Sequence, residues 1–188
     1  NGVALFNISV PIGVYDAKVN FIGDDEYIKS SEEVTIIPIS TIEFKSSNYP
    51  TDSNYLATLR DSNGKLLVNQ KAEVAINGKT YSAVSDKNGQ ISVKLNLNPG
   101  SYSVKITNPV TGEVRFQTIN VLKRIVQNRD LTIYYGSSTL YKVRVYDDLA
   151  KFSKGLKVTF RINGKTYYGI TDNNGYASFK IPQLNMGL

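Results

Sequence analysis

The chain has 188 residues and a formal net charge of +6, and it contains neither cysteine nor histidine. The missing residue types exclude disulfide bonds, thiolate chemistry, Cys or His metal ligands and a Ser–His nucleophile pair. No apolar run approaches the ~20 residues that a membrane span requires, so we expect no membrane contact by this segment. The lysines are spread singly over polar positions, which indicates a solvated surface rather than a nucleic-acid interface.

Residues 1–40 contain three strand-like runs and one polar turn, Gly23–Tyr27. In the second run apolar and polar residues alternate, which is the period of a half-buried strand. We therefore predict strands at Val3–Val10, Val14–Ile22 and Glu33–Ile39.

Residues 41–125 predict seven strands, with turn signals every eight to twelve residues. Asn-Gly pairs favour tight hairpins because both residues tolerate positive φ. These pairs are Asn63-Gly64, Asn77-Gly78 and Asn88-Gly89. We expect the inward-facing residues to include Ala72, Val74, Ile76, Ile91, Val93, Leu95, Tyr102, Val104 and Ile106.

Residues 126–188 restart the same pattern. Ile76–Leu95 recurs as Ile162–Ile181 at an offset of 86 residues, and eleven of the twenty aligned positions are identical. A fixed period of this size indicates an array of one small folding unit. Asn163-Gly164 and Asn174-Gly175 are the expected hairpin turns of the later copy.

Short strands rich in β-branched and aromatic residues predict an all-β sandwich, with about 86 residues per unit. We predict that residues 1–40 form the C-terminal half of one unit, residues 41–125 a complete unit, and residues 126–188 the N-terminal part of the next. No signal peptide is recognisable, so we expect a piece from the interior of a longer protein.

Several short motifs, taken together, are typical of one family. They are Tyr134–Ser137, Ile76–Tyr81 with Ile162–Tyr167, Ser85–Gly89 with Thr171–Gly175, Pro99–Tyr102, and Gly23–Ser30. On these motifs the chain resembles the Ig-like repeats of adhesin-like surface proteins of methanogenic archaea, which are similar to bacterial Ig-like domains. The resemblance implies tandem immunoglobulin-like β-sandwich repeats in extracellular stalks or filaments at the cell surface, with cell adhesion as their role.

We predict no catalytic residue, no cofactor and no metal site. Gly23–Glu26 offers carboxylates of the kind that calcium prefers, but the middle unit lacks this acidic pair, so a polar turn is the favoured interpretation. Asp86 and Asp172 each precede a glycine by three residues. An aspartate at that place commonly accepts backbone N–H groups of its own turn.

Two kinds of residue are candidate contact points. Exposed aromatic side chains could stack on sugar rings or on another protein. The candidates are Tyr134, Tyr135, Tyr167 and Tyr168. Asn7 begins the only Asn-x-Ser/Thr sequon and is the candidate glycosylation site.

The favoured hypothesis is a non-enzymatic extracellular structural and adhesive repeat that spaces a binding region from the cell. The alternative is a carbohydrate-binding module that uses the exposed tyrosines of the third unit. An accessory domain of a surface enzyme would leave the same sequence pattern. Expected partners are adjacent repeats of the same or another copy, and surface glycans or proteins of another cell, with no nucleic acid.

The two incomplete units are complementary in content. Residues 1–40 supply the part of a unit that residues 126–188 lack, and the two segments carry net charges of −4 and +5. If the 188 residues are one polypeptide, we expect head-to-tail strand complementation between copies, which would produce an open filament unless the geometry closes a ring. If they are a piece of a longer chain, the missing strands are its covalent neighbours, and the same string of sandwiches results.

Overall fold

The computed structural model describes residues 3–8 and 10–182. They belong to two compact units, residues 1–41 and 42–188. Every regular element in the described part is a β-strand, which confirms the predicted all-β fold class. A search of these residues finds no helix that is long and apolar enough to cross a membrane.

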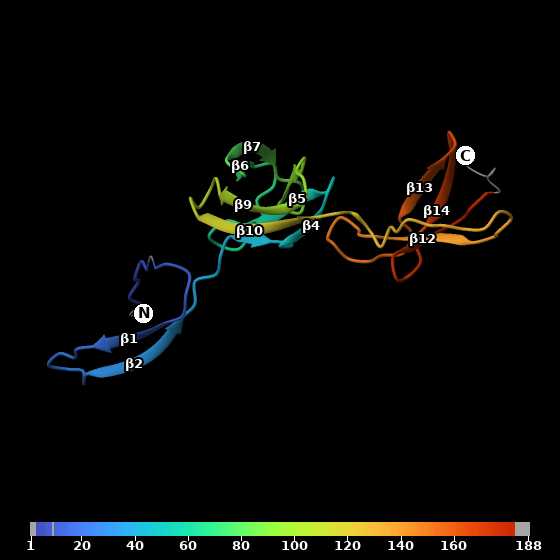
Figure 1. Ribbon diagram of the computed structural model, residues 1–188. Coiled ribbons are helices and arrows are strands. Elements are labelled where there is room, and N and C mark those ends of the chain that lie inside the picture. The colour runs from blue at the N-terminus through green and yellow to red at the C-terminus, as the bar shows by residue number, and fades with distance from the viewer. Residues whose placement is uncertain (1–2, 9, 183–188) are drawn as a thin grey trace. The chain divides into compact units, whose positions relative to one another are not determined.

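The first unit contains one antiparallel hairpin, β1 (Tyr15–Phe21) and β2 (Ser30–Ile36), which Figure 1 shows in blue. The strand predicted at 14–22 is confirmed, whereas the next strand begins and ends three residues earlier than predicted. The strand predicted at 3–10 is wrong, because described residues 3–8 have no strand structure. Apolar alternation alone does not make a strand, since a ladder also needs a partner for its N–H and C=O groups.

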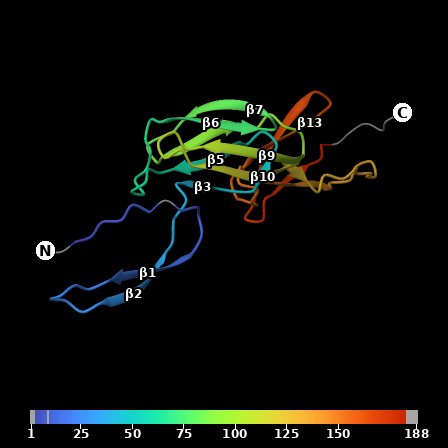
Figure 2. The same cartoon turned by 90° about the vertical axis from the view of Figure 1, so that its left-hand side faces the viewer.

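The middle segment, defined here as residues 42–124, forms two sheets around one core (Figures 1 and 2). The larger sheet has the order β4-β10-β9-β6-β7, and the smaller has the order β3-β5-β8. β4 runs parallel to β10, and the other neighbours are antiparallel. The strands are β3 (Ile42–Phe44), β4 (Asn48–Pro50), β5 (Asn54–Leu59), β6 (Lys71–Ile76), β7 (Lys79–Val84), β8 (Gln90–Lys94), β9 (Gly100–Thr107) and β10 (Val114–Leu122).

The first strand of this segment is divided between the two sheets. β3 pairs with β5 in the smaller sheet, and β4 pairs with β10 in the larger one. Ser46 holds the crossing, because its hydroxyl donates to the carbonyl oxygen of Asn48 at 2.8 Å and accepts the Asn48 N–H at 3.0 Å. The predicted seven strands are therefore eight, and one short run of chain contributes an edge to both sheets.

Alternating residues of these strands fill the core. All nine residues expected to face inward are buried except Tyr102, which is half-buried and packs against the core. The rings of Tyr49 and Tyr55 add to it, with centroids 5.7 Å apart. Burial raises the pKa of the Tyr55 hydroxyl, because the charged phenolate would lose its hydration there.

The C-terminal segment, defined here as residues 125–182, repeats part of this arrangement. Its β12–β15 pairing runs from Leu140↔Lys180 and the β5–β8 pairing from Asn54↔Lys94, an offset of 86 on both strands. A smaller core contains Val143, Val145, Val158, Ala177 and Phe179. The strands are β11 (Ile125–Val126), β12 (Leu140–Val145), β13 (Lys157–Ile162), β14 (Lys165–Ile170) and β15 (Tyr176–Lys180), in sheets of order β11-β12-β15 and β13-β14.

The Asn-Gly pairs form two different kinds of turn. Asn77-Gly78 and Asn163-Gly164 have positive φ at both residues and close the hairpins β6–β7 and β13–β14, as predicted. Asn88-Gly89 and Asn174-Gly175 were expected to be hairpins as well, and this is wrong. At Asn88-Gly89 only the glycine has positive φ, and the turn passes from β7 in one sheet to β8 in the other.

An aspartate organises these other turns. The Asp86 carboxylate accepts the N–H groups of Asn88 and Gln90 at 2.8 and 2.9 Å, and Asp172 does the same at its own turn. The predicted turn-capping role of both aspartates is confirmed. Hydrogen bonds from the N–H groups of Gln90 and Asn88 lower the pKa of Asp86, because they stabilise the ionised carboxylate. Asp61 and Asp147 form two further turns of this kind that the sequence analysis missed.

We predict that residues 42–125, expressed alone, fold as a stable monomer, because every member of the larger core lies within them. A cooperative thermal unfolding transition and a well-dispersed amide NMR spectrum are the expected results. A non-cooperative melt would show that this core depends on the flanking residues.

Candidate functional site

The contacts that join the middle and C-terminal segments centre on Arg124. This residue follows β10 and directly precedes β11, so a linker of two residues connects the last strand of one segment to the first strand of the next. Its side chain is 26% exposed. A guanidinium group has five N–H donors in a planar fork and can therefore bond to several acceptors at once.

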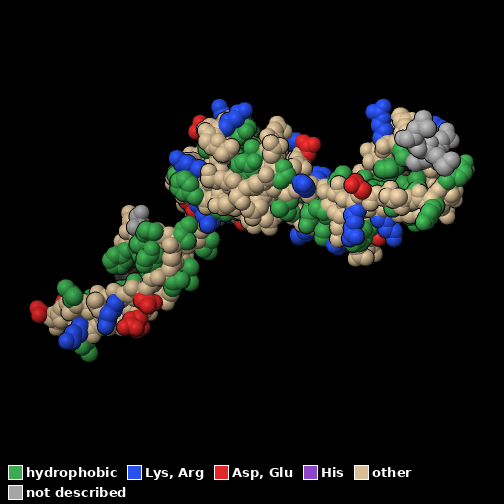
Figure 3. Space-filling view, viewed as in Figure 1, with side chains coloured by type: hydrophobic (Ala, Val, Ile, Leu, Met, Phe, Trp, Pro, Cys, Tyr) green, Lys and Arg blue, Asp and Glu red, His purple; other side chains and the backbone are tan. Residues whose placement is uncertain are grey.

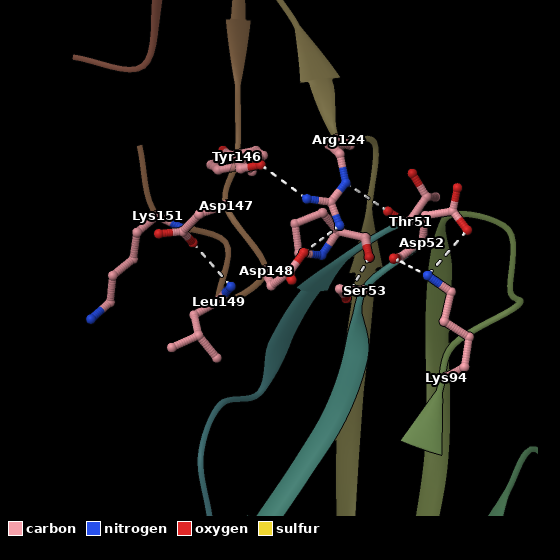
Figure 4. Close-up of polar contacts among 11 residues, drawn as sticks. Thr51, Asp52, Ser53, Lys94, Arg124, Tyr146, Asp147, Asp148, Leu149 and Lys151 are labelled. Carbon is pink, nitrogen blue, oxygen red and sulfur yellow. Dashed lines mark hydrogen bonds and ion pairs between the residues drawn. The ribbon is translucent and has the colours of Figure 1, made fainter. Parts of the chain in front are cut away.

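Arg124 bonds to both segments (Figure 4). Its Nε donates to the carbonyl oxygen of Thr51 in the middle segment at 2.9 Å. On the other side, Nη1 donates to the Tyr146 carbonyl oxygen at 3.3 Å, and Nη2 donates to Asp148 Oδ1 at 2.7 Å. The backbone takes part as well, because the Tyr146 N–H donates to the Arg124 carbonyl oxygen at 3.0 Å.

The Thr51 acceptor is held in place by its own turn. The Thr51 N–H donates to the carbonyl oxygen of Leu122 at 2.8 Å, which ties the turn to the end of β10. The next residue, Asp52, has a positive φ of 68°, and Lys94 bonds to its carbonyl oxygen and carboxylate. Buried Ser53 donates its hydroxyl to the Pro50 carbonyl oxygen at 2.7 Å. Contacts within the middle segment therefore hold the turn that carries the Thr51 carbonyl oxygen, the acceptor for Arg124.

The acceptors on the C-terminal side lie in a turn that Asp147 organises. Asp147 Oδ1 accepts the N–H groups of Leu149 and Lys151, and its Oδ2 accepts the hydroxyl of Ser153. Partial burial acts to raise the pKa of Asp147, but these hydrogen bonds outweigh it and the pKa is lowered. The ring of Tyr146 also stacks on Phe152 with centroids 4.4 Å apart. The turn organised by Asp147 therefore sets the positions of the two acceptors, the Tyr146 carbonyl oxygen and the Asp148 carboxylate.

The sequence analysis did not find Arg124, because the Arg124–Asp148 pair is not part of the 86-residue period. The residue at the corresponding offset from Asp148 is Ser62. The hairpin registers Tyr15↔Ile36 and Tyr102↔Ile119 place Thr41 at the position that corresponds to Arg124. The junction residues are therefore not among the positions that repeat between units. The sequence signal for the junction is an arginine directly after the last strand of the complete unit.

The four tyrosines proposed as ligand contacts do not share one environment. Tyr134 and Tyr135 lie in the chain before β12 and are 93% and 63% exposed. Tyr168 is 66% exposed on β14, with Lys157 Nζ 5.3 Å from its ring centroid. Tyr167 is half-buried and packs against the core of the C-terminal segment. Adjacent strand residues point to opposite faces, so Tyr167 and Tyr168 cannot contact one flat ligand together.

The remaining candidates lie in the first unit. Asn7 is exposed, while Ser9 of its sequon lies outside the described residues. Asp24 accepts the N–H groups of Glu26 and Tyr27 at 2.9 and 2.7 Å, as expected for a polar turn. The described residues contain no group of three acidic side chains arranged to hold a metal ion.

No known family model and no curated protein matches the chain. Among solved structures it is similar to a Ca²⁺-stabilised adhesin that helps an Antarctic bacterium bind ice, at 17% identity and a TM-score of 0.28 over 88% of this chain and 47% of that one. It is also similar to SGBP-B of the Bacteroides ovatus mixed-linkage glucan utilization locus, at 12% identity and a TM-score of 0.33 over 95% of this chain and 46% of that one. A third structure, from a 1.5-MDa bacterial ice-binding adhesin, has 17% identity and a TM-score of 0.27 over 89% of this chain and 63% of that one.

The chain spans about half the length of the first two of these structures and less than two thirds of the third.

We predict that Arg124→Ala loosens the junction, because it removes hydrogen bonds from a charged donor that are worth on the order of 1–3 kcal/mol together. Nitroxide labels on Thr80→Cys and Thr166→Cys, which are exposed and 86 residues apart, report the inter-segment distance by pulsed EPR. The expected result is a narrow distance distribution that broadens in Arg124→Ala.

Lys94→Ala is the matched control, because its ion pair with Asp52 lies within the middle segment. It should leave the distribution narrow. Equal widths in all three proteins would contradict the role given to Arg124.

Proposed function

We propose that this chain is a non-enzymatic structural segment of an extracellular adhesive protein, and that it spaces a binding region from the cell surface. On this proposal the units are immunoglobulin-like and tandem, and each supplies length rather than chemistry. A linear array of similar units stabilises itself mainly through contacts between neighbours. The contacts between neighbouring units therefore decide how stiff the array is.

The observation that carries the proposal is the Arg124 junction. A flexible tether between domains would be long and rich in small polar residues. Here two residues connect β10 to β11, and the second of them bonds to backbone carbonyls on both sides. Such a junction limits the motion of one unit against the next, which is what a spacer requires.

The chemistry of the side chains supports a non-enzymatic role. A general base that titrates near neutral pH is most often histidine, and the chain has none. The pKa values of Asp86 and Asp147 are lowered, and the pKa of Tyr55 is raised. The two aspartates hold turns, and the tyrosine fills the core. Their shifts have structural explanations and need no catalytic one.

Immunolabelling of cells that produce the protein tests the proposed location. Antibodies raised against the 188-residue chain should label intact cells, and brief protease treatment of intact cells should remove the signal. Labelling that appears only after the cells are permeabilised would contradict the proposal.

A carbohydrate-binding module is the second candidate, and the exposed rings of Tyr134, Tyr135 and Tyr168 favour it. On the spacer proposal, a glycan array probed with the whole chain should give no specific binding. Binding that is lost in both Tyr135→Ala and Tyr168→Ala, but kept in Phe116→Ala, would favour the module instead. Phe116 is the matched control, because it is a 72% exposed aromatic residue of the middle segment.

A further inference from the structure

The outer face of the smaller sheet in the C-terminal segment is basic. On β12, Val143 and Val145 are buried in the core, so Lys142 and Arg144, which alternate with them, lie on the outer face. Tyr176 lies directly opposite Arg144 on β15. This face therefore combines two positive charges with an aromatic ring.

The corresponding face of the middle segment is uncharged at these positions. Leu56 and Thr58 precede Lys142 and Arg144 by 86 residues, in strand β5. Thr58 is only 4% exposed. The strand pairing is thus shared by the two segments, whereas the basic residues belong to the C-terminal segment alone.

Two aromatic rings and one hydrogen bond hold the guanidinium group of Arg144. Its Cζ lies 3.4 Å from the ring centroid of Phe152 and 5.0 Å from that of Tyr176, both within the range of a cation–π contact. Its Nε donates to the Asn174 carbonyl oxygen at 2.8 Å. The ring of Phe152 is itself stacked on that of Tyr146. These contacts restrict the orientation of the guanidinium group.

The close approach of Phe152 depends on a glycine. Gly175 has a φ of 76°, and a Cβ added there would lie 2.9 Å from the Phe152 Cβ. In the middle segment the equivalent Gly89 is covered by Leu66, which precedes Phe152 by 86 residues. The turn is therefore common to both segments, and only the C-terminal one has a ring that contacts Arg144.

The remaining donors of Arg144 are available to a ligand. A guanidinium group has five N–H donors, and the Nε of Arg144 uses one of them. Within residues 3–8 and 10–182, neither Nη atom of Arg144 donates a hydrogen bond, and no carboxylate forms an ion pair with Arg144 or Lys142. An anion could therefore bind here without displacing a partner in the described part of the chain.

Every acidic side chain of residues 140–182 is already engaged. Asp147 and Asp172 accept backbone N–H groups of their own turns, and Asp148 pairs with Arg124. Residues 140–182 carry eight basic and three acidic side chains, a net charge of +5. Figure 3 shows Lys and Arg side chains, in blue, on the visible face of the C-terminal segment. This surplus of positive charge favours an anionic partner.

We propose that Lys142 and Arg144 form a binding site for an acidic polypeptide segment in extended conformation. Residues two positions apart on a strand are separated by about 6.6 Å. Carboxylates at alternate positions of an extended peptide have the same spacing, so that one reaches Arg144 and the next reaches Lys142. The fork of Arg144 suits a carboxylate because two of its N–H groups can bond to the two oxygens at once.

Leu140 extends the site by one further position. It lies on the same face, two residues before Lys142, and is 52% exposed. An apolar side chain of the partner would cover it. The partner motif is therefore two acidic residues at alternate positions and an apolar residue at the next alternate position.

Three blocked hexapeptides test the chemistry and the spacing of the partner on the whole 188-residue chain. In an NMR titration, Glu-Ser-Glu-Ser-Leu-Ser should shift the side-chain Nε–H signal of Arg144, and Gln-Ser-Gln-Ser-Leu-Ser should not. Glu-Glu-Ser-Ser-Leu-Ser points its carboxylates to opposite sides of an extended chain and should bind more weakly than the first peptide. No shift with the first peptide, or equal affinity for all three, would overturn the proposal.

Variants of the chain locate the site, with fluorescence anisotropy of the labelled first peptide as the measurement. Arg144→Thr introduces the residue that the middle segment has at this position, and it should raise the Kd at least about fivefold. Arg144→Lys keeps the charge but loses the fork, so its Kd should lie between those of the unmodified chain and Arg144→Thr.

The matched control is Lys165→Ala, which removes one positive charge from the exposed turn between β13 and β14. It should leave the Kd nearly unchanged. An equal loss of affinity in Lys165→Ala and Arg144→Thr would show attraction by net charge alone and would overturn the site.

Digalacturonic acid represents acidic polysaccharides, because it carries the same number of carboxylates as the first peptide. At equal concentration it should displace less of the labelled peptide than the unlabelled peptide does. Stronger displacement by digalacturonic acid would overturn the assignment to a polypeptide. None of these outcomes depends on whether the chain serves as a spacer.

Discussion

The fold depends on the burial of one apolar sheet face against another. A sheet that is apolar on one side gains stability only when that side is covered, at roughly 25 cal/mol for each Å² of apolar surface removed from water. The middle segment meets this requirement with its own strands, and Ile91 of the smaller sheet and Ile106 of the larger one are both fully buried. Side chains also join the sheets at their edge, where Gln117 Nε2 donates to the Ser46 carbonyl oxygen at 2.8 Å.

The same requirement explains why the described units differ in burial. The C-terminal segment has the smaller sheet of the sandwich but only two strands of the larger one, and its Phe160 and Tyr167 are half-buried. The described strands of the first unit form a single hairpin with no opposing sheet, and most of their side chains are exposed.

Patterns that depend on neighbouring residues predicted much of this structure. Alternation located β6, β8 and β9 and the side of each that faces the core, since that period is a local property of the chain. The Asn-Gly pairs at Asn77 and Asn163 correctly predicted the turns of the hairpins β6–β7 and β13–β14, whereas the same rule was wrong at Asn88 and Asn174. The offset of 86 residues anticipated the repeated strand registers without any contact being known.

The features that sequence reasoning missed depend on contacts between distant residues. The division of the first strand between two sheets depends on β5 and β10, which lie on opposite sides of the core. Asn88-Gly89 resembles a hairpin turn in sequence, but Asp86 accepts its N–H groups and sends the chain to the other sheet. Arg124 was missed for a third reason, because its partners Thr51 and Asp148 are 73 and 24 residues away and belong to no repeated motif.

Amide hydrogen exchange, followed by mass spectrometry, tests most directly whether burial of one sheet face against another holds the fold. The account predicts strong protection of β6, β9 and β10, because two sheets enclose their core. It predicts weak protection of β1 and β2, whose side chains are mostly exposed. Protection of β1 and β2 as strong as that of β9 and β10 would contradict it.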